Sequence, residues 1–142
     1  MNRTDTLLRL KRFRVDEIKR RISAIDVMRA NLERKLGDLD EDVAREKQRA
    51  GESDIGRLAF PSFLRSVETR RQNLRHTLKE MEREYESAQS ELAGAFQDLK
   101  ALEFAAEQQA KRLREIEARR AQTRLDELAL AGHLRKHALK SA

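Results

Sequence analysis

Two histidines near the C-terminus, His133 and His137, stand four residues apart, a spacing that puts both on one face of a helix. Histidines at this spacing can bind zinc, but a zinc site takes at least three protein ligands. No third ligand is identifiable for this pair, and the chain contains no cysteine. We therefore predict no metal site and interpret the pair as ordinary polar residues near the end of a helix.

The acidic residues form two dense clusters, and neither has the spacing of a catalytic or metal-binding site. The clusters are Asp38, Asp40, Glu41 and Asp42, and Glu80, Glu82, Glu84 and Glu86. The first lacks the glycine and the alternating ligands of a calcium loop. In the second, a spacing of two residues points neighbouring carboxylates in different directions on a helix, so they form no acid–base pair. Because the chain also lacks a cysteine nucleophile and a glycine-rich phosphate loop, we expect no enzyme activity, no cofactor and no small-molecule substrate.

The composition favours long helices over a globular core. Ala, Leu, Glu, Lys and Arg fill 84 of the 142 positions, charged residues make up 39% and aromatic residues 4%, and there is one proline. Such proportions are typical of coiled coils. Bulky apolar residues are too few to fill a sandwich, a barrel or a doubly wound sheet, so the sequence predicts an all-α protein.

An apolar stripe with heptad spacing runs through the first third of the chain. With Leu8 as an a position, ten of the thirteen a and d sites are apolar. The a sites are Leu8, Val15, Ile22, Arg29, Leu36, Val43 and Ala50, and the d sites are Lys11, Ile18, Ile25, Leu32, Leu39 and Glu46. This pattern predicts a helix over residues 4–50 whose apolar face packs against another helix. Arg29 interrupts the a row, and we expect Met28 to cover part of the gap.

A longer stripe follows steps of three and four residues through the second half of the chain. Its members are Leu64, Val67, Arg71, Leu74, Leu78, Met81, Tyr85, Ala88, Leu92, Ala95, Leu99, Leu102, Ala106, Gln109, Leu113 and Ile116. The stripe then changes phase and continues as Ala121, Leu125 and Leu128, which we expect to disturb supercoiling locally.

The strongest break in the chain lies between the stripes, where two glycines, Ser53-Asp54 and Pro61 fall within eleven residues. Because proline is tolerated in the first turn of a helix but not in its interior, we expect a turn over residues 51–61 and a second helix over 62–137. Two helices that each carry one apolar stripe can bury both stripes as an antiparallel coiled-coil hairpin. The sequence thus predicts a single elongated domain over residues 1–142, with residue i opposite a residue numbered about 111 − i.

The predicted helices differ in length, roughly 70 Å for the first and roughly 110 Å for the second at about 1.5 Å per residue. We therefore expect the second helix to overhang the first by about 30 residues. Such an overhang cannot bury its apolar positions within one hairpin, so it either meets a partner or frays. A generic homodimeric coiled-coil scaffold, in which two overhangs cover each other, is one alternative for the function.

The net charge of +6 is concentrated at the two ends of the sequence. Residues 1–21 and residues 111–142 each carry +5, whereas residues 22–110 carry −4. A hairpin brings both basic segments to one end, which favours an electrostatic docking tip over a merely solvated face. The basic residues of this predicted tip are Arg9, Lys11, Arg12, Arg14, Lys19, Arg20, Arg21, Lys111, Arg112, Arg114, Arg119 and Arg120.

A basic nucleic-acid-binding coiled coil is a second alternative, because residues 9–21 have the composition of a zipper-type basic region. However, Val15 and Ile18 already belong to the apolar stripe, and Asp16 and Glu17 would face the phosphates. We therefore favour a protein partner over nucleic acid.

Bulky apolar residues crowd the predicted turn and the start of the second helix. They are Ile55, Leu58, Phe60, Phe63, Leu64 and Val67. They either pack across the end of the hairpin or present an apolar knob to a partner.

The N-terminus carries a charge every two or three residues, which leaves no room for the apolar core of a signal peptide. The longest apolar run, residues 128–131, is far shorter than a membrane-spanning helix requires. We expect a cytoplasmic protein that reaches a membrane only through its partners.

Two segments of the sequence resemble those of a known family. The first runs from Leu7 to Glu17 and resembles the opening of FliJ proteins, the small coiled-coil component of the flagellar type III export apparatus. The second runs from Glu46 to Leu74, with Arg49-Ala50-Gly51-Glu52-Ser53-Asp54 and Phe60-Pro61 within it, and resembles the hairpin region of the alphaproteobacterial branch. The chain departs from other branches in having no Trp and a single Tyr, so contacts that rest on aromatic residues there are not carried over.

The resemblance implies a non-enzymatic stalk or adaptor, similar to the γ subunit of rotary ATPases, that takes part in flagellum biogenesis, protein transport and motility. The partners it implies are the hexameric export ATPase FliI, the export gate protein FlhA and export chaperones, at the cytoplasmic side of the inner membrane beneath the flagellum. On this basis we expect the basic tip to bind the ATPase ring and promote its assembly. We expect the apolar residues around the turn to bind the gate.

Overall fold

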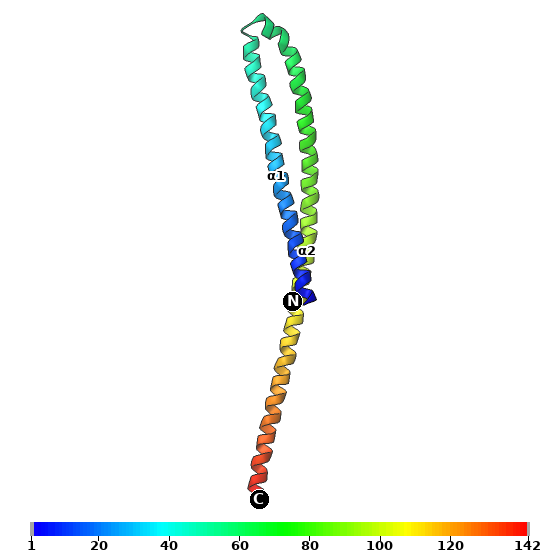
Figure 1. Cartoon of the computed structure of the whole chain (residues 1–142), viewed down its shortest axis with the longest axis vertical. Helices are drawn as coiled ribbons and strands as arrows, with labels where there is room; N and C mark the ends of the chain where they lie inside the picture. The colour runs from blue at the N-terminus through cyan, green and yellow to red at the C-terminus, as the bar shows by residue number, and fades with distance from the viewer. Residues whose placement is uncertain (1, 142) are drawn as a thin grey trace. The chain divides into compact units, whose positions relative to one another are not determined.

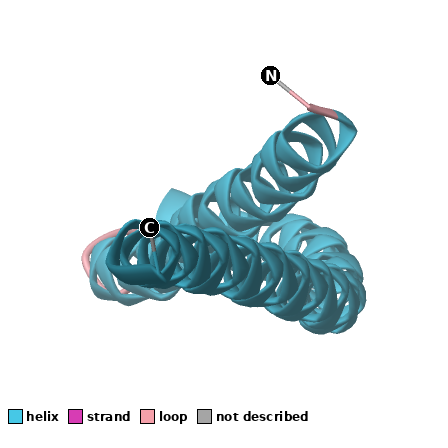
Figure 2. Cartoon of the chain, turned by 90° about the horizontal axis from the view of Figure 1, so that it is seen from below, coloured by secondary structure: helices cyan, strands magenta, loops and turns pink. Residues whose placement is uncertain are grey.

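The computed structural model describes residues 2–141, which form two helices, α1 (Arg3–Ala50) and α2 (Asp54–Ser141), joined by a turn of three residues. Figure 2 shows helix almost throughout, with loop confined to the turn and the N-terminal end, and no strand occurs in the described residues. The two long helices pack against each other, which confirms the predicted all-α hairpin.

The chain divides into two compact units, and both helices pass from one unit into the other. The hairpin unit is Arg9–Gln97. The terminal unit comprises the described residues of Met1–Leu8 and Asp98–Ala142. The prediction that residues 1–142 act as a single domain stays a prediction.

In the hairpin unit, α1 and α2 lie side by side and run in opposite directions (Figure 1). Two contacts between the helices define their register. Arg71 donates to Asp40 at 2.6 Å, and Arg21 donates to Glu91 at 2.9 Å. Both pairs lie within one residue of the register predicted from a fold about the central break.

The core of the hairpin unit is the predicted stripe. The twelve a and d sites from Lys11 to Ala50 are all buried or half-buried. Ile18, Ile22 and Ile25 of α1 form one cluster with Ala88 of α2, and Ile18 and Ala88 are 1% and 0% exposed. Heptad spacing therefore identified the packed face of α1 correctly, because an apolar repeat of this period can be buried only along one line of contact with a second helix.

Arg29, the interruption of the a row, is covered differently from the prediction. Met28 is 49% exposed, so it is not the main cover of the gap. Instead, the Arg29 guanidinium carbon lies 4.8 Å from the centre of the Tyr85 ring. The aromatic face attracts the cation, so Tyr85 of α2 covers the guanidinium.

The turn is shorter than predicted, because α2 begins at Asp54 and contains Pro61 in its interior. Ser53 caps the helix: its Oγ accepts the backbone N–H of Gly56 at 3.0 Å, and its carbonyl accepts that of Arg57 at 3.2 Å. An acidic residue in the first turn adds to this start signal. Pro61 removes one backbone hydrogen bond from the helix but does not delay its start, and α2 bends shortly after the turn in Figure 1.

The terminal unit contains a short packed part and a long exposed part. Leu99 is buried, and Leu8, Leu102 and Ala106 are half-buried. From residue 107 to residue 141 every described residue is exposed except the half-buried Ala131. The apolar positions of this segment therefore find no cover in the terminal unit, although α2 continues through them as an unbroken helix.

Candidate functional site

The predicted basic residues fall into two groups that belong to different units. Residues 9–21 lie in the α1 part of the hairpin unit, and residues 111–120 lie in the α2 part of the terminal unit. All twelve are exposed except Lys11, a half-buried seam site. The convergence of the two groups on one tip stays a prediction.

Within the first group, two arginines already have an acidic partner on the other helix. Arg21 binds Glu91 at 2.9 Å, and Arg14 lies 3.6 Å from the same carboxylate. The hydrogen bond from Arg21, together with the charges of Arg21 and Arg14, lowers the pKa of Glu91 below the ordinary value of 4.5. Arg14 and Arg21 thus help to hold the hairpin together, whereas Arg9 and Lys19 lie within ion-pair distance of no carboxylate among residues 2–141.

Two exposed apolar residues stand among these cations and were not singled out from the sequence. Leu10 is 59% exposed and Phe13 is 58% exposed. The guanidinium of Arg20 lies over the Phe13 ring, 5.8 Å from its centre. Both are bulky apolar residues outside the a and d rows of α1. An apolar residue off the packed face is a sequence signal that could have identified them. The first turns of α1 therefore present apolar as well as basic groups to the solvent.

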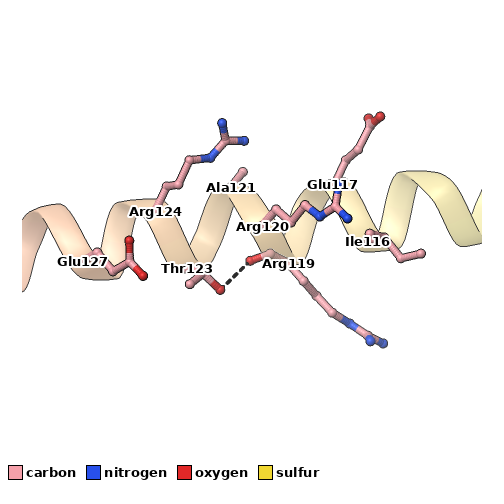
Figure 3. Close-up of a pocket in the computed structure, with 8 residues that line it drawn as sticks. All are labelled: Ile116, Glu117, Arg119, Arg120, Ala121, Thr123, Arg124 and Glu127. Atoms are coloured by element: carbon pink, nitrogen blue, oxygen red, sulfur yellow. Dashed lines mark hydrogen bonds between the residues drawn. The ribbon is translucent and has the colours of Figure 1, made fainter.

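The second group lies along a continuous stretch of α2 without internal partners. Lys111, Arg112, Arg114, Arg119 and Arg120 are all exposed, and within the described chain none of them lies within ion-pair distance of a carboxylate. Figure 3 shows the side chains between Ile116 and Glu127 spreading to different sides of a single helix. The one hydrogen bond drawn there joins the Thr123 hydroxyl to the Arg119 carbonyl, at 2.9 Å. One helix cannot enclose a small molecule, so this stretch suits a macromolecular surface and not a metabolite.

The predicted apolar residues near the turn divide into exposed and packed ones. Ile55 and Leu58 are 81% and 82% exposed. Phe60 and Phe63 are half-buried and stack on each other, with ring centres 6.4 Å apart. Val67 is buried in the seam, and Leu64 is 38% exposed. The structure thus assigns a packing role to Val67 and leaves Ile55 and Leu58 as the most accessible apolar pair.

The two C-terminal histidines lie in no metal-binding group of the described residues. His133 and His137 stack with ring centres 6.3 Å apart, but residues 2–141 contain no group of three side chains arranged to hold a metal ion. Nor does either helix, over the residues described, contain a stretch apolar enough to cross a membrane.

One comparison with known proteins gives a match. A family model described as "Flagellar FliJ protein" matches residues 1–138. No curated protein matches the chain. No solved structure matches it either.

Proposed function

Since the chain belongs to the family of flagellar FliJ proteins, we propose that it acts as a stalk or adaptor that binds the hexameric export ATPase and promotes its assembly. Membership makes the protein a component of the flagellar export apparatus, and the family is non-catalytic. Links to the export gate and to export chaperones, and a position at the cytoplasmic side of the inner membrane, belong to the same proposal.

The observation that supports ATPase binding most directly is the set of unpaired cations between residues 111 and 120. Exposed cations without internal partners lose no existing contact when an acidic surface approaches them. They also lie on a helix whose apolar side chains, such as Leu113 and Ile116, are 56% and 42% exposed. An exposed helix that combines basic and apolar groups is suited to an acidic, partly apolar protein surface.

Charge reversal tests this surface. Arg112→Glu with Arg114→Glu should reduce binding to the export ATPase and stimulation of its assembly, while circular dichroism stays helical. Arg75→Glu with Arg83→Glu is the matched control, because it makes the same charge change at exposed positions of the hairpin unit. Equal binding by both variants would refute the role of the 111–120 segment.

The contribution of α1 needs a separate variant, because Arg14 and Arg21 hold Glu91 and their loss also weakens the hairpin. Arg9→Glu with Lys19→Glu avoids that contact. If this pair reduces ATPase binding without lowering thermal stability, the basic residues of α1 belong to the docking surface as well. Binding unchanged from the parent would limit the surface to α2.

The gate contact is proposed for the opposite end of the hairpin unit, where Ile55 and Leu58 are exposed. Large aliphatic side chains on adjacent turns of a helix suit an apolar groove on a partner. Ile55→Ser with Leu58→Ser should reduce binding to the export gate protein and spare ATPase binding. The stacked residues give a useful contrast: if Phe60→Ala with Phe63→Ala lowers both interactions together with thermal stability, the two rings only pack the start of α2.

A further inference from the structure

The seam of the hairpin unit contains one charged residue that meets its partner inside the seam. Arg29 occupies an a site of α1, and its guanidinium lies over Tyr85, which belongs to the apolar stripe of α2. Glu46 is a half-buried charged d site of α1, closer to the turn. It pairs with Arg49 on its own helix at 3.2 Å. Arg29 and Tyr85 therefore recognise each other across the seam, whereas Glu46 recognises only a neighbour.

The environment of Arg29 makes it costly to move the guanidinium away from Tyr85. The side chain is 30% exposed, one guanidinium nitrogen lies 3.6 Å from Asp26, and Nε is buried without a hydrogen-bond partner in the described residues. A cation in such a place is tolerated because the ring face attracts it. Without the ring, the half-buried guanidinium would be less well compensated, with Asp26 at 3.6 Å as its remaining partner in the described residues.

The residues one heptad before and after Tyr85 show what Arg29 would face if α2 shifted along α1. A shift of one heptad along α2 replaces Tyr85 by Leu78 or Leu92 opposite Arg29. Either leucine would leave the guanidinium against an aliphatic side chain. The aliphatic seam residues near Arg29, such as Ile22, Ile25 and Leu32, are interchangeable and give little resistance to a slip. The ion pairs Arg71–Asp40 and Arg21–Glu91, on either side of this stretch, favour the same register, and a slip would break them as well.

We infer that the Arg29–Tyr85 contact is a register lock: it holds α1 and α2 in a single antiparallel alignment and disfavours pairing of the α1 stripe with a second copy of the chain. A polar residue at one a site is known to select register and oligomeric state in coiled coils at some expense of stability. Here the contact joins the two helices of one hairpin, with Arg29 on α1 and Tyr85 on α2.

Cross-linking measures the register directly, because the chain has no cysteine of its own. Ile22→Cys with Ala88→Cys joins two members of one packed cluster and reports the native alignment. Ile22→Cys with Ala95→Cys reports an alignment shifted by one heptad. In the parent chain we expect intramolecular cross-linking of the first pair only.

Arg29→Leu should raise the ratio of shifted to native cross-links by about tenfold, or produce a concentration-dependent dimer in sedimentation. Its helix content and melting temperature should be equal to or higher than those of the parent. Arg29→Lys should keep the parent pattern, because the ammonium can still lie over the ring. Glu46→Leu is the matched control: it also places leucine at a half-buried charged seam site, and it should change neither the register nor the oligomeric state.

Tyr85→Leu tests the lock from the other helix and should also raise the shifted cross-link, with a lower melting temperature since Arg29 keeps its charge. Combined with Arg29→Leu, it should recover the melting temperature but not the single register. If Arg29→Leu keeps a monomer with only the native cross-link, the proposal is overturned and Arg29 is merely a tolerated interruption. A register shift in Glu46→Leu as large as that in Arg29→Leu would overturn the proposal as well.

Discussion

The hairpin unit and residues 107–141 of the terminal unit are made from similar sequence but differ in what happens to their apolar side chains. In the hairpin unit the stripes of α1 and α2 cover each other, and Ile18 is 1% exposed. Between residues 107 and 141 the apolar residues stay open to solvent, and Leu128 is 67% exposed. Helical amphipathicity is common to both regions, so what separates them is the presence of a facing helix. The uncovered stretch is where the protein has most to gain from a partner.

Amide hydrogen exchange should separate the two regions most strongly. Amides between residues 15 and 95 should exchange only through opening of the packed hairpin, whereas those between residues 110 and 141 should exchange faster by orders of magnitude, because an unpacked helix opens locally at little cost. Mass spectrometry of exchanged peptides gives the measurement. Comparable protection in both regions would mean that residues 110–141 are covered in solution, and sedimentation would then show whether a second copy covers them.

Truncation of one buried and one exposed apolar side chain should give the next largest contrast. Ile18→Ala removes a fully buried side chain from the main cluster and should lower the free energy of unfolding by about 2–5 kcal/mol. Leu128→Ala should change it by no more than about 0.5 kcal/mol. Urea unfolding followed by circular dichroism tests both, and a large loss from Leu128→Ala would contradict the exposed state of the segment.

Alanine substitutions at Gly56, beside the turn, and at Gly132, in the exposed segment, should have opposite effects on stability. A Cβ at Gly56 would lie 3.1 Å from both the Ala50 Cα and the Arg49 carbonyl oxygen, so Gly56→Ala must push the ends of the helices apart and should destabilise the hairpin by about 1–3 kcal/mol. At Gly132 nothing lies within 4 Å, so Gly132→Ala should raise the helix content through its higher helix propensity, by up to about 1 kcal/mol. Gly37, which is equally unobstructed, is the control inside the hairpin unit. Melting curves that show Gly37→Ala to be as harmful as Gly56→Ala would contradict the close approach at the turn.

The smallest effect concerns acid sensitivity, which we expect in the hairpin unit. Arg21 lowers the pKa of Glu91 in the folded state below the ordinary value of 4.5, so the ionised carboxylate stabilises the fold. This contribution is present above the ordinary pKa and is lost as the pH falls through the lowered one. Glu91→Gln should therefore flatten the decline of melting temperature on the acid side of about pH 5, and salt should weaken the difference between variant and parent. Glu82→Gln, at another exposed glutamate of α2, should leave the decline as in the parent.

The heptad pattern was sufficient to predict the packed face of α1, because one line of contact accounts for every a and d site from Lys11 to Ala50. The start of α2 was predicted too late. Pro61 was given more weight than Ser53, although a good cap outweighs one missing hydrogen bond farther along a long helix. Contacts outside the seam, such as that of Glu91 with Arg14 and Arg21, depend on side-chain reach across the helix pair, which spacing along one helix does not specify.

The capped turn also bears on how the hairpin unit forms in time. Contacts between the helices become steadily less local away from the turn: Asp40 and Arg71 are 31 residues apart in sequence, and Arg21 and Glu91 are 70 apart. Since closing a longer loop costs more chain entropy, pairing of α1 with α2 should begin beside Ser53 and Gly56 and extend along the helices away from the turn. Changes at the turn should then slow folding, while changes around Glu91 should mainly speed unfolding. The residues that end α1 and start α2 thus set how quickly the register held by Arg29 is reached.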